Sequence, residues 1–216
     1  MSDYERRRKR MVQEQLKHRG ILDPAVLEAM RTVPRERFVP AAKAESAYAD
    51  GPVGIGEGQT ISQPFIVAAM VEAAQLSASD RVLEVGAGSG YAAAIMGRIA
   101  QQVYAIERHA ELAKGAQRRF DALGYRNIRL RVSDGTLGWP EEAPFDAILV
   151  AASGPDAPSA LKQQLRMGGR LVMPVGESEG SQRLIKLTRT GPDAFEQQDL
   201  GAVAFVPLIG AQGWNE

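Results

Sequence analysis

The sequence of 216 residues predicts an α/β fold built around a mainly parallel sheet. After Asp80, short apolar runs alternate with helical patterns, which is typical of βαβ units. The first of these runs, residues 81–85, leads directly into three glycines at alternate positions, Gly86, Gly88 and Gly90. The part before Asp80 carries helical spacing instead. We therefore expect a parallel-sheet core, preceded by a helical extension and followed by a pair of late strands.

Length and charge limit the class of protein. The chain is long enough for one α/β domain with a full core and too short for two of ordinary size. We expect one compact domain with two parts: an N-terminal helical extension with a functional loop at residues 1–76, and the sheet core at residues 77–216. Lys plus Arg and Asp plus Glu number 26 each, so no net charge favours nucleic acid or an anionic membrane as a partner.

Cysteine usage and hydropathy exclude further classes. The absence of cysteine excludes disulfides, thiolate nucleophiles and zinc–sulfur sites, and only His18 and His109 supply imidazole, so we expect no metal site. No apolar run approaches the ~18 residues of a membrane helix, and no apolar stretch of a signal peptide follows the basic N-terminus. We therefore expect a cytoplasmic protein and, with balanced charge and no apolar stripe left over, a monomer.

Two helices are expected in the N-terminal extension. Apolar residues recur at helical spacing along residues 4–19, and Gly20 is placed to end that helix. Asp23 and Pro24 are typical of the N-cap and first position of a second helix. The basic cluster at residues 6–10 is either an arm for nucleic acid or a solvated helix face, and neighbouring acidic residues favour the solvated face.

Residues 50–63 are rich in turn formers and exclude a helix or a long strand. The segment is either an ordered functional loop or a flexible linker. We favour the ordered loop because Ile55 and Ile61 give it apolar anchors and its composition is not that of a Gly/Ser linker. Pro64 then begins a third helix.

Further strands and helices follow from the alternating pattern after Asp80. The expected strands are residues 81–85, 102–106, 128–133, 145–151 and 169–175, and the expected helices are residues 90–100, 109–123 and 157–166. The last part predicts two strands, residues 182–190 and 201–208, joined at Gly191-Pro192-Asp193 as a hairpin.

The glycine run after the first core strand predicts a loop that binds a nucleotide cofactor. Glycine lets the backbone turn tightly and approach a ligand, and the next helix offers unpaired N–H groups to an anion. The dinucleotide fingerprint G-x-G-x-x-G would need a small residue at position 91, where this chain has Tyr91, so NAD is disfavoured. A tight strand-to-helix turn without any ligand stays open as the alternative.

Two acidic residues fit S-adenosylmethionine better than NAD. Glu84 lies directly before the loop, and Glu107 ends the next expected strand, about 20 residues after Gly86, near the spacing at which a carboxylate receives ribose hydroxyls. Ribose is common to both cofactors, so Glu107 alone does not decide between them. Asp134 ends the third strand and is a candidate for adenine recognition, with an Asx turn before Gly135 as the equal alternative.

Six segments carry a resemblance to a known family. They are residues 33–40 (VPRERFVP), 59–64 (QTISQP), 85–91 (VGAGSGY), 143–146 (APFD), 168–176 (GGRLVMPVG) and 205–208 (FVPL). Over nearly its whole length the chain resembles the protein-L-isoaspartate O-methyltransferases. The glycine loop belongs to many methyltransferases, whereas QTISQP is far narrower.

The resemblance implies a Rossmann-like, seven-stranded methyltransferase sheet with helices on both faces. It also implies S-adenosylmethionine as methyl donor, S-adenosylhomocysteine as product, and the α-carboxylate of L-isoaspartyl residues in damaged peptides and proteins as acceptor. Ser62 matches the family's active-site serine, and its alternative role is an N-cap for the helix that Pro64 begins. Two residues depart from those common in the family: Ala87, at the position of a hydrogen bond to the cofactor, and Phe65, at the mouth of the substrate site.

The predicted site has a cofactor side and a substrate side that share Ser62. Expected at the cofactor are Gln59, Thr60, Ile61, Ser62, Glu84, Gly86, Gly88, Ser89, Gly90, Glu107, Arg108, Asp134 and Gly135. Expected at the substrate are Ile55, Ile61, Ser62 and Val206. A carboxylate with a pKa near 3.5 is already ionised at neutral pH, so the reaction needs no general base. Two rivals remain: a methyltransferase for a small acid or another acceptor, and a non-catalytic adenosyl-binding protein.

Overall fold

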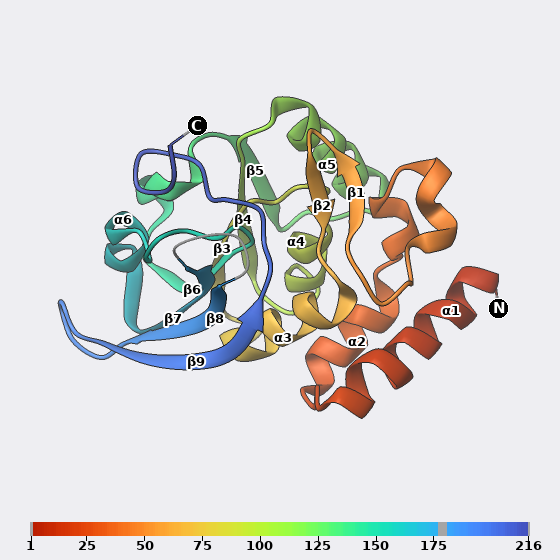
Figure 1. The fold of residues 1–216 in the computed structure, drawn as a ribbon, viewed down its shortest axis with the longest axis horizontal. Coiled ribbons are helices and arrows are strands. Elements are labelled where there is room, and N and C mark those ends of the chain that lie inside the picture. Colours follow the sequence, from red (N-terminus) through yellow and green to blue (C-terminus); the bar gives the residue numbers. More distant parts are fainter. Residues whose placement is uncertain (1, 177–180, 216) are drawn as a thin grey trace.

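A computed structural model describes residues 2–176 and 181–215, and its centre is a seven-stranded sheet (Figure 1). The strand order is β5-β4-β3-β6-β7-β8-β9. The strands are β3 Arg81–Val85, β4 Gln102–Glu107, β5 Ile128–Val132, β6 Phe145–Val150, β7 Leu165–Val175, β8 Gln182–Arg189 and β9 Phe195–Val203. Strands β3 to β7 run parallel, and β8 pairs antiparallel with both β7 and β9. The predicted α/β fold with a C-terminal strand pair is confirmed.

Helices cover both faces of this sheet. Alternate residues of a strand point to opposite faces, and in β3 Val82 packs with one core cluster and Leu83 with the other. The first cluster includes the apolar sides of α3 Pro64–Ala74, α4 Tyr91–Met96 and α5 Ala110–Ala122. The second includes Leu161 of the short helix α6 Ser159–Gln163.

The N-terminal extension forms the expected helices. α1 Asp3–Met11 continues through a π-helical segment, Val12–Leu16, and a 3-10 turn, and ends at Gly20 with φ +94°. α2 Pro24–Thr32 is N-capped by Asp23, whose carboxylate accepts from the N–H groups of Ala25 and Val26. In the basic cluster, Arg7 pairs with Asp3 and Glu45, as expected of a solvated helix face.

A short hairpin and two 3-10 helices connect the extension to the core. The 3-10 helices are Arg35–Phe38 and Ala41–Ser46, and the hairpin consists of β1 Val53–Gly56 and β2 Gln59–Ile61. The hairpin is the ordered loop expected at residues 50–63. Met11, Leu16 and Met30 share one buried cluster with residues of α3 and the sheet. The division at residue 76 stays a prediction, and its outer ends, Met1 and Glu216, lie outside the described residues.

Several predicted boundaries are wrong, and one of them is the end of α4, which lies at Met96 and not at residue 100. The last strand is Phe195–Val203 and not 201–208, because β9 is an edge strand with an exposed, polar first half that carries no apolar alternation. A register shift near Gly201, at φ +118°, interrupts its pairing with β8. Strand β7 begins at Leu165 and not at 169, so α6 ends at Gln163.

Candidate active site

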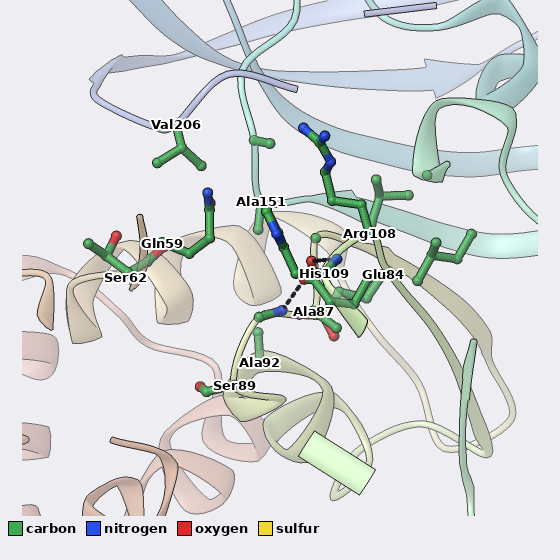
Figure 2. A pocket seen from close by; sticks show the side chains of 18 of the residues that line it. Gln59, Ser62, Glu84, Ala87, Ser89, Ala92, Arg108, His109, Ala151 and Val206 are labelled. Carbon is green, nitrogen blue, oxygen red and sulfur yellow. Dashed lines mark hydrogen bonds between the residues drawn. The ribbon is translucent and has the colours of Figure 1, made fainter. Parts of the chain in front are cut away.

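One pocket lies where the carboxyl ends of the central strands meet the β1–β2 hairpin, and Figure 2 shows Gln59, Ser62 and Val206 on one side of it and Glu84, Arg108 and His109 on the other. Most of the predicted site residues line this pocket. They are Gln59, Thr60, Ile61, Ser62, Glu84, Gly86, Gly88, Ser89, Glu107, Arg108, Gly135 and Val206. The structure thus brings together residues that lie more than a hundred positions apart in the chain.

The glycine loop is fixed by hydrogen bonds to the end of β4. The N–H groups of Gly86 and Ala87 both donate to the carbonyl oxygen of Ile106, at 2.9 and 3.1 Å. Gly90 does not line the pocket: at φ +87°, a Cβ there would stand 2.6 Å from the Phe120 ring. The packing of α5 therefore explains this glycine, and its predicted contact with the cofactor stays a prediction.

Glu107 joins the loop to the next strand. Its Oε2 accepts from the N–H of Gly88 at 2.7 Å, and its Oε1 accepts from the N–H of His109 at 2.9 Å. The side chain is only 4% exposed and lines the pocket. A carboxylate oxygen accepts more than one hydrogen bond, so Glu107 is held in place by the protein and still has capacity for ribose hydroxyls.

Glu84 is a buried carboxyl group that lacks a full set of partners. The residue is 2% exposed, and its Oε2 has no hydrogen-bond partner among the described residues. Burial, and then the neighbouring charge of Glu107, raise the pKa of Glu84 well above its usual range. Buried polar atoms are normally satisfied, and Glu84 is one of the residues that line the pocket, so a cationic or hydrogen-donating ligand fits here.

Ser62 lines the pocket just after β2, on the side predicted to bind the substrate. The predicted alternative of an N-cap is wrong, because the N-cap of α3 is Gln63 and no side chain caps that helix. The Ser62 main-chain oxygen accepts from Nη2 of Arg35 at 2.7 Å. Its hydroxyl makes no hydrogen bond to another described residue and is therefore available to a ligand in the pocket.

The β1–β2 hairpin leans over the glycine loop. Ile55 does not line the pocket, but its Cδ1 lies 3.2 Å from the point where Gly88 would carry a Cβ. Across the hairpin tip, Oε2 of Glu57 lies 4.0 Å from Nδ1 of His109. The hairpin thus spans the space between the glycine loop and the start of α5.

Asp134 stands behind the pocket rather than in its lining. Its Oδ1 accepts from the N–H and hydroxyl of Thr136, at 2.8 and 2.7 Å, and its Oδ2 accepts from the N–H of Ala211 at 2.8 Å. The Asx turn is therefore present, and Gly135 lines the pocket. Adenine recognition by Asp134 stays a prediction.

The C-terminal segment carries Val206 to the pocket. The N–H of Ser153, just after β6, donates to the carbonyl of Val206 at 2.8 Å, and the N–H of Leu208 donates back to the carbonyl of Ser153 at 2.8 Å. This pairing holds the segment along the side of the pocket that is predicted to bind the substrate.

Sequence reasoning missed several apolar residues that line the pocket. They include Val67, Ile106, Ala151, Pro207 and Ile209. Ile106, near the end of β4, and Ala151, directly after β6, could have been found from the rule that ligands bind at carboxyl ends of strands. Val67 gave no signal, because its place in a helical apolar stripe is that of an ordinary core residue.

Similarity to known proteins agrees with this geometry. Residues 6–213 match the family Protein-L-isoaspartate(D-aspartate) O-methyltransferase. The chain belongs to this family. The Protein-L-isoaspartate O-methyltransferase 2 of Pelobacter propionicus is 56% identical over 214 residues, which cover 99% of this chain and 95% of that protein. The Protein-L-isoaspartate O-methyltransferase of Methylorubrum extorquens is 60% identical over 206 residues, 95% of this chain and 90% of that one.

Two solved structures share the whole architecture. A protein-L-isoaspartate O-methyltransferase superposes with a TM-score of 0.84 at 28% identity, covering 95% of this chain and 67% of that chain. The second is a Plasmodium falciparum protein described as a putative protein-L-isoaspartate O-methyltransferase in complex with S-adenosyl-L-homocysteine. It superposes with a TM-score of 0.81 at 28% identity, and the match covers 94% of this chain and 98% of that chain.

The pocket fits an adenosyl cofactor. It offers the glycine loop at Gly86 and Gly88, a fixed acid at Glu107, and a buried carboxyl group at Glu84 with one unsatisfied oxygen. Within residues 2–176 and 181–215, no group of three or more His, Asp or Glu side chains is placed to hold a metal ion. In the same described ranges, no helix is long and apolar enough to cross a membrane.

Proposed function

We infer that the protein is an S-adenosylmethionine-dependent protein-L-isoaspartate O-methyltransferase. It transfers a methyl group to the free α-carboxylate of L-isoaspartyl residues in damaged peptides and proteins, the first step of their repair. The family match over residues 6–213 carries this conclusion, and Gln59–Ser62 of the narrow QTISQP segment line the predicted cofactor pocket.

The reaction needs alignment more than acid–base chemistry. A carboxylate oxygen attacks the methyl carbon, the C–S bond breaks, and its electron pair stays on sulfur, which leaves as a neutral thioether. The acceptor is already ionised, so no proton has to be removed. The rate enhancement comes from holding the oxygen, carbon and sulfur atoms in line and from excluding water. Such positioning can lower the activation barrier by as much as ~7–11 kcal/mol.

The residues of the pocket divide between the two reactants. Glu107 receives the ribose hydroxyls, and Glu84 faces the cationic part of the donor. The segment from Gln59 to Ser62 closes the cofactor from the other side. The Ser62 hydroxyl donates a hydrogen bond that orients the acceptor carboxylate and does not act as a nucleophile. These roles are supported by the placement of Glu84, Glu107 and the segment Gln59–Ser62 around one cavity.

The acceptor enters as an extended segment. Isoaspartate adds a methylene to the main chain, so its path differs from that of an aspartyl peptide, and main-chain pairing in the manner of strand addition suits the Val206 segment and the hairpin around Ile55. Flexible, accessible segments are then methylated faster than the same residue in a rigid host. Equal rates on a rigid folded host would count against this mode of binding.

We further propose that the protein acts as a cytoplasmic monomer and does not use nucleic acid as a partner. The balance of 26 basic and 26 acidic residues supports the last point. Light scattering after size-exclusion chromatography, with and without a substrate peptide, tests the oligomeric state. Fractionation of the source cells tests the compartment.

The deciding experiment is methyl transfer from labelled S-adenosylmethionine to a short L-isoaspartyl peptide, beside the same peptide with L-aspartate. Base-labile label on the isoaspartyl peptide alone is the expected result. Binding of S-adenosylhomocysteine without labelling of either peptide would place the acceptor elsewhere, and free carboxylic acids would then be assayed. Binding without turnover on any acceptor would favour a non-catalytic adenosyl-binding protein.

A further inference from the structure

The first arginine of the VPRERFVP segment lies in the interior of the protein. Arg35 is 0% exposed and is among the largest fully buried side chains. It begins the 3-10 helix Arg35–Phe38, which follows α2 and precedes the β1–β2 hairpin in the chain. Arginine is almost never fully buried unless it is paired with an acid, so its surroundings need an explanation.

Arg35 has no acidic partner among the described residues. Its Nε donates to the carbonyl of Ala47 at 2.7 Å and its Nη2 to the carbonyl of Ser62 at 2.7 Å, while Nη1 has no partner. Burial lowers the pKa of the guanidinium, but arginine stays protonated in proteins. The side chain is therefore a buried cation held by two main-chain oxygens.

The buried Arg170 shows what a structural arginine looks like in the same protein. It is 8% exposed, donates to the carbonyls of Ala74 and Gln75 at 2.7 and 2.8 Å, and forms an ion pair with Asp80 at 3.0 Å. A buried charge without such a partner is costly, and well-packed apolar residues often do as well or better for stability. Stability alone therefore accounts poorly for Arg35.

The third contact of Arg35 reaches the cofactor side. Its guanidinium carbon lies 4.8 Å from the ring centroid of Tyr91, the first residue of α4 and the residue directly after Gly90. One planar group thus touches the main chain of Ser62 and the helix that follows the glycine loop. Because the Ser62 hydroxyl has no hydrogen-bond partner among the described residues, its position depends on the main chain that Arg35 holds.

We propose that Arg35 is a positioning residue for methyl transfer: it fixes the main chain of Ser62 against the start of α4, so that the acceptor carboxylate and the methyl donor meet in line. The inference rests on the proposed function and on the role of Ser62 within it. Arg35 itself touches neither reactant. Small errors in alignment are costly, since a misplacement of about 1 Å can reduce a rate ~100-fold.

The test uses Arg35→Met and Arg35→Lys, with Arg170→Lys as the matched control for a buried arginine that serves stability. For each folded variant, kcat and KM are measured on an L-isoaspartyl peptide, and the Kd for S-adenosylhomocysteine is measured by calorimetry, all at a temperature below every Tm. We expect kcat to fall roughly 10- to 100-fold in Arg35→Met and by less in Arg35→Lys, with the Kd within about threefold of the parent value. Arg170→Lys should lower Tm and leave kcat within about twofold.

The outcomes separate this inference from the proposed function. If the parent enzyme does not label the peptide, the proposed function is refuted, whatever the variants do. An active parent with an unchanged kcat in Arg35→Met, or an equal fall in kcat in Arg170→Lys, overturns the positioning role. If Arg35→Met does not fold, Arg35→Lys decides: a kcat at least fivefold lower with an intact Kd supports the role, and an unchanged kcat refutes it.

Discussion

The two sides of the pocket are built in different ways. The cofactor side is made from β3 and β4, central strands that are buried on both faces, and its loop is hydrogen-bonded to a strand carbonyl. The opposite side, which is predicted to close over the cofactor and to carry the acceptor residue Ser62, is a hairpin that forms a two-stranded sheet of its own. Arg35 ties that serine to the interior.

This difference matches two different tasks. The cofactor is always the same molecule, so a rigid, preformed site costs least on binding. The acceptor is a segment of many different proteins, so its site needs main-chain contacts that tolerate any side chain. Changes on the cofactor side should therefore act on cofactor affinity, and changes on the acceptor side on turnover.

The largest effect is expected from Glu107→Ala. The substitution removes two hydrogen bonds that hold the glycine loop and His109, together with the predicted acceptor for ribose. Hydrogen bonds to charged groups are worth about 1.5–3 kcal/mol each, so the Kd for S-adenosylhomocysteine should rise at least ~100-fold by calorimetry. Glu111→Gln, an exposed acid on α5, is the control and should leave it unchanged. An affinity within tenfold of the parent would show that Glu107 only stabilises the fold.

A smaller effect, on methyl transfer and not on cofactor affinity, is expected from Ser62→Ala. Loss of one hydrogen bond to a charged carboxylate is worth about 1.5–3 kcal/mol, so kcat/KM on the isoaspartyl peptide should fall roughly 10- to 100-fold. The affinity for S-adenosylhomocysteine should stay the same, because the main chain of residue 62 is kept. An unchanged kcat/KM would remove the orienting role of the hydroxyl, and Ser79→Ala on the surface is the control.

The rigidity of the cofactor loop can be measured by comparing Gly90→Ala with Gly20→Ala. Both glycines have a left-handed backbone, with φ +87° at Gly90 and +94° at Gly20. A Cβ at Gly90 would stand 2.6 Å from the Phe120 ring, whereas a Cβ at Gly20 would have no described atom within 4 Å. In each variant the strained backbone should lower the free energy of unfolding by about 1–2 kcal/mol. Overpacking against Phe120 should lower it by a further ~1–3 kcal/mol in Gly90→Ala. Equal losses in chemical denaturation would mean that Phe120 moves aside freely and that the loop is not tightly packed.

The same contrast explains what the sequence could predict. The buried parallel strands carry apolar runs with turns after them, and the residues at their ends, such as Glu84 and Glu107, follow from the topology of any such sheet. Strand β9 was misplaced because an exposed edge strand needs no apolar alternation. Arg35 gave no signal for burial, since an arginine in a charged segment predicts surface. Long-range packing decides such residues, and local pattern does not.

The smallest effect is a change in how stability depends on pH. Burial, with the charge of Glu107, raises the pKa of Glu84 above its value in the unfolded chain. Between those two pKa values the folded protein binds more protons than the unfolded one, so this residue makes stability fall as the pH rises. Glu84→Gln removes that loss. Its Tm advantage over the parent should therefore be absent near pH 4 and grow toward pH 8, by roughly 2–4 °C for each kcal/mol. The comparison is made without cofactor, because a bound cation would favour the ionised form of Glu84. A Tm difference that is constant with pH would mean that Glu84 ionises in the folded protein as it does in water.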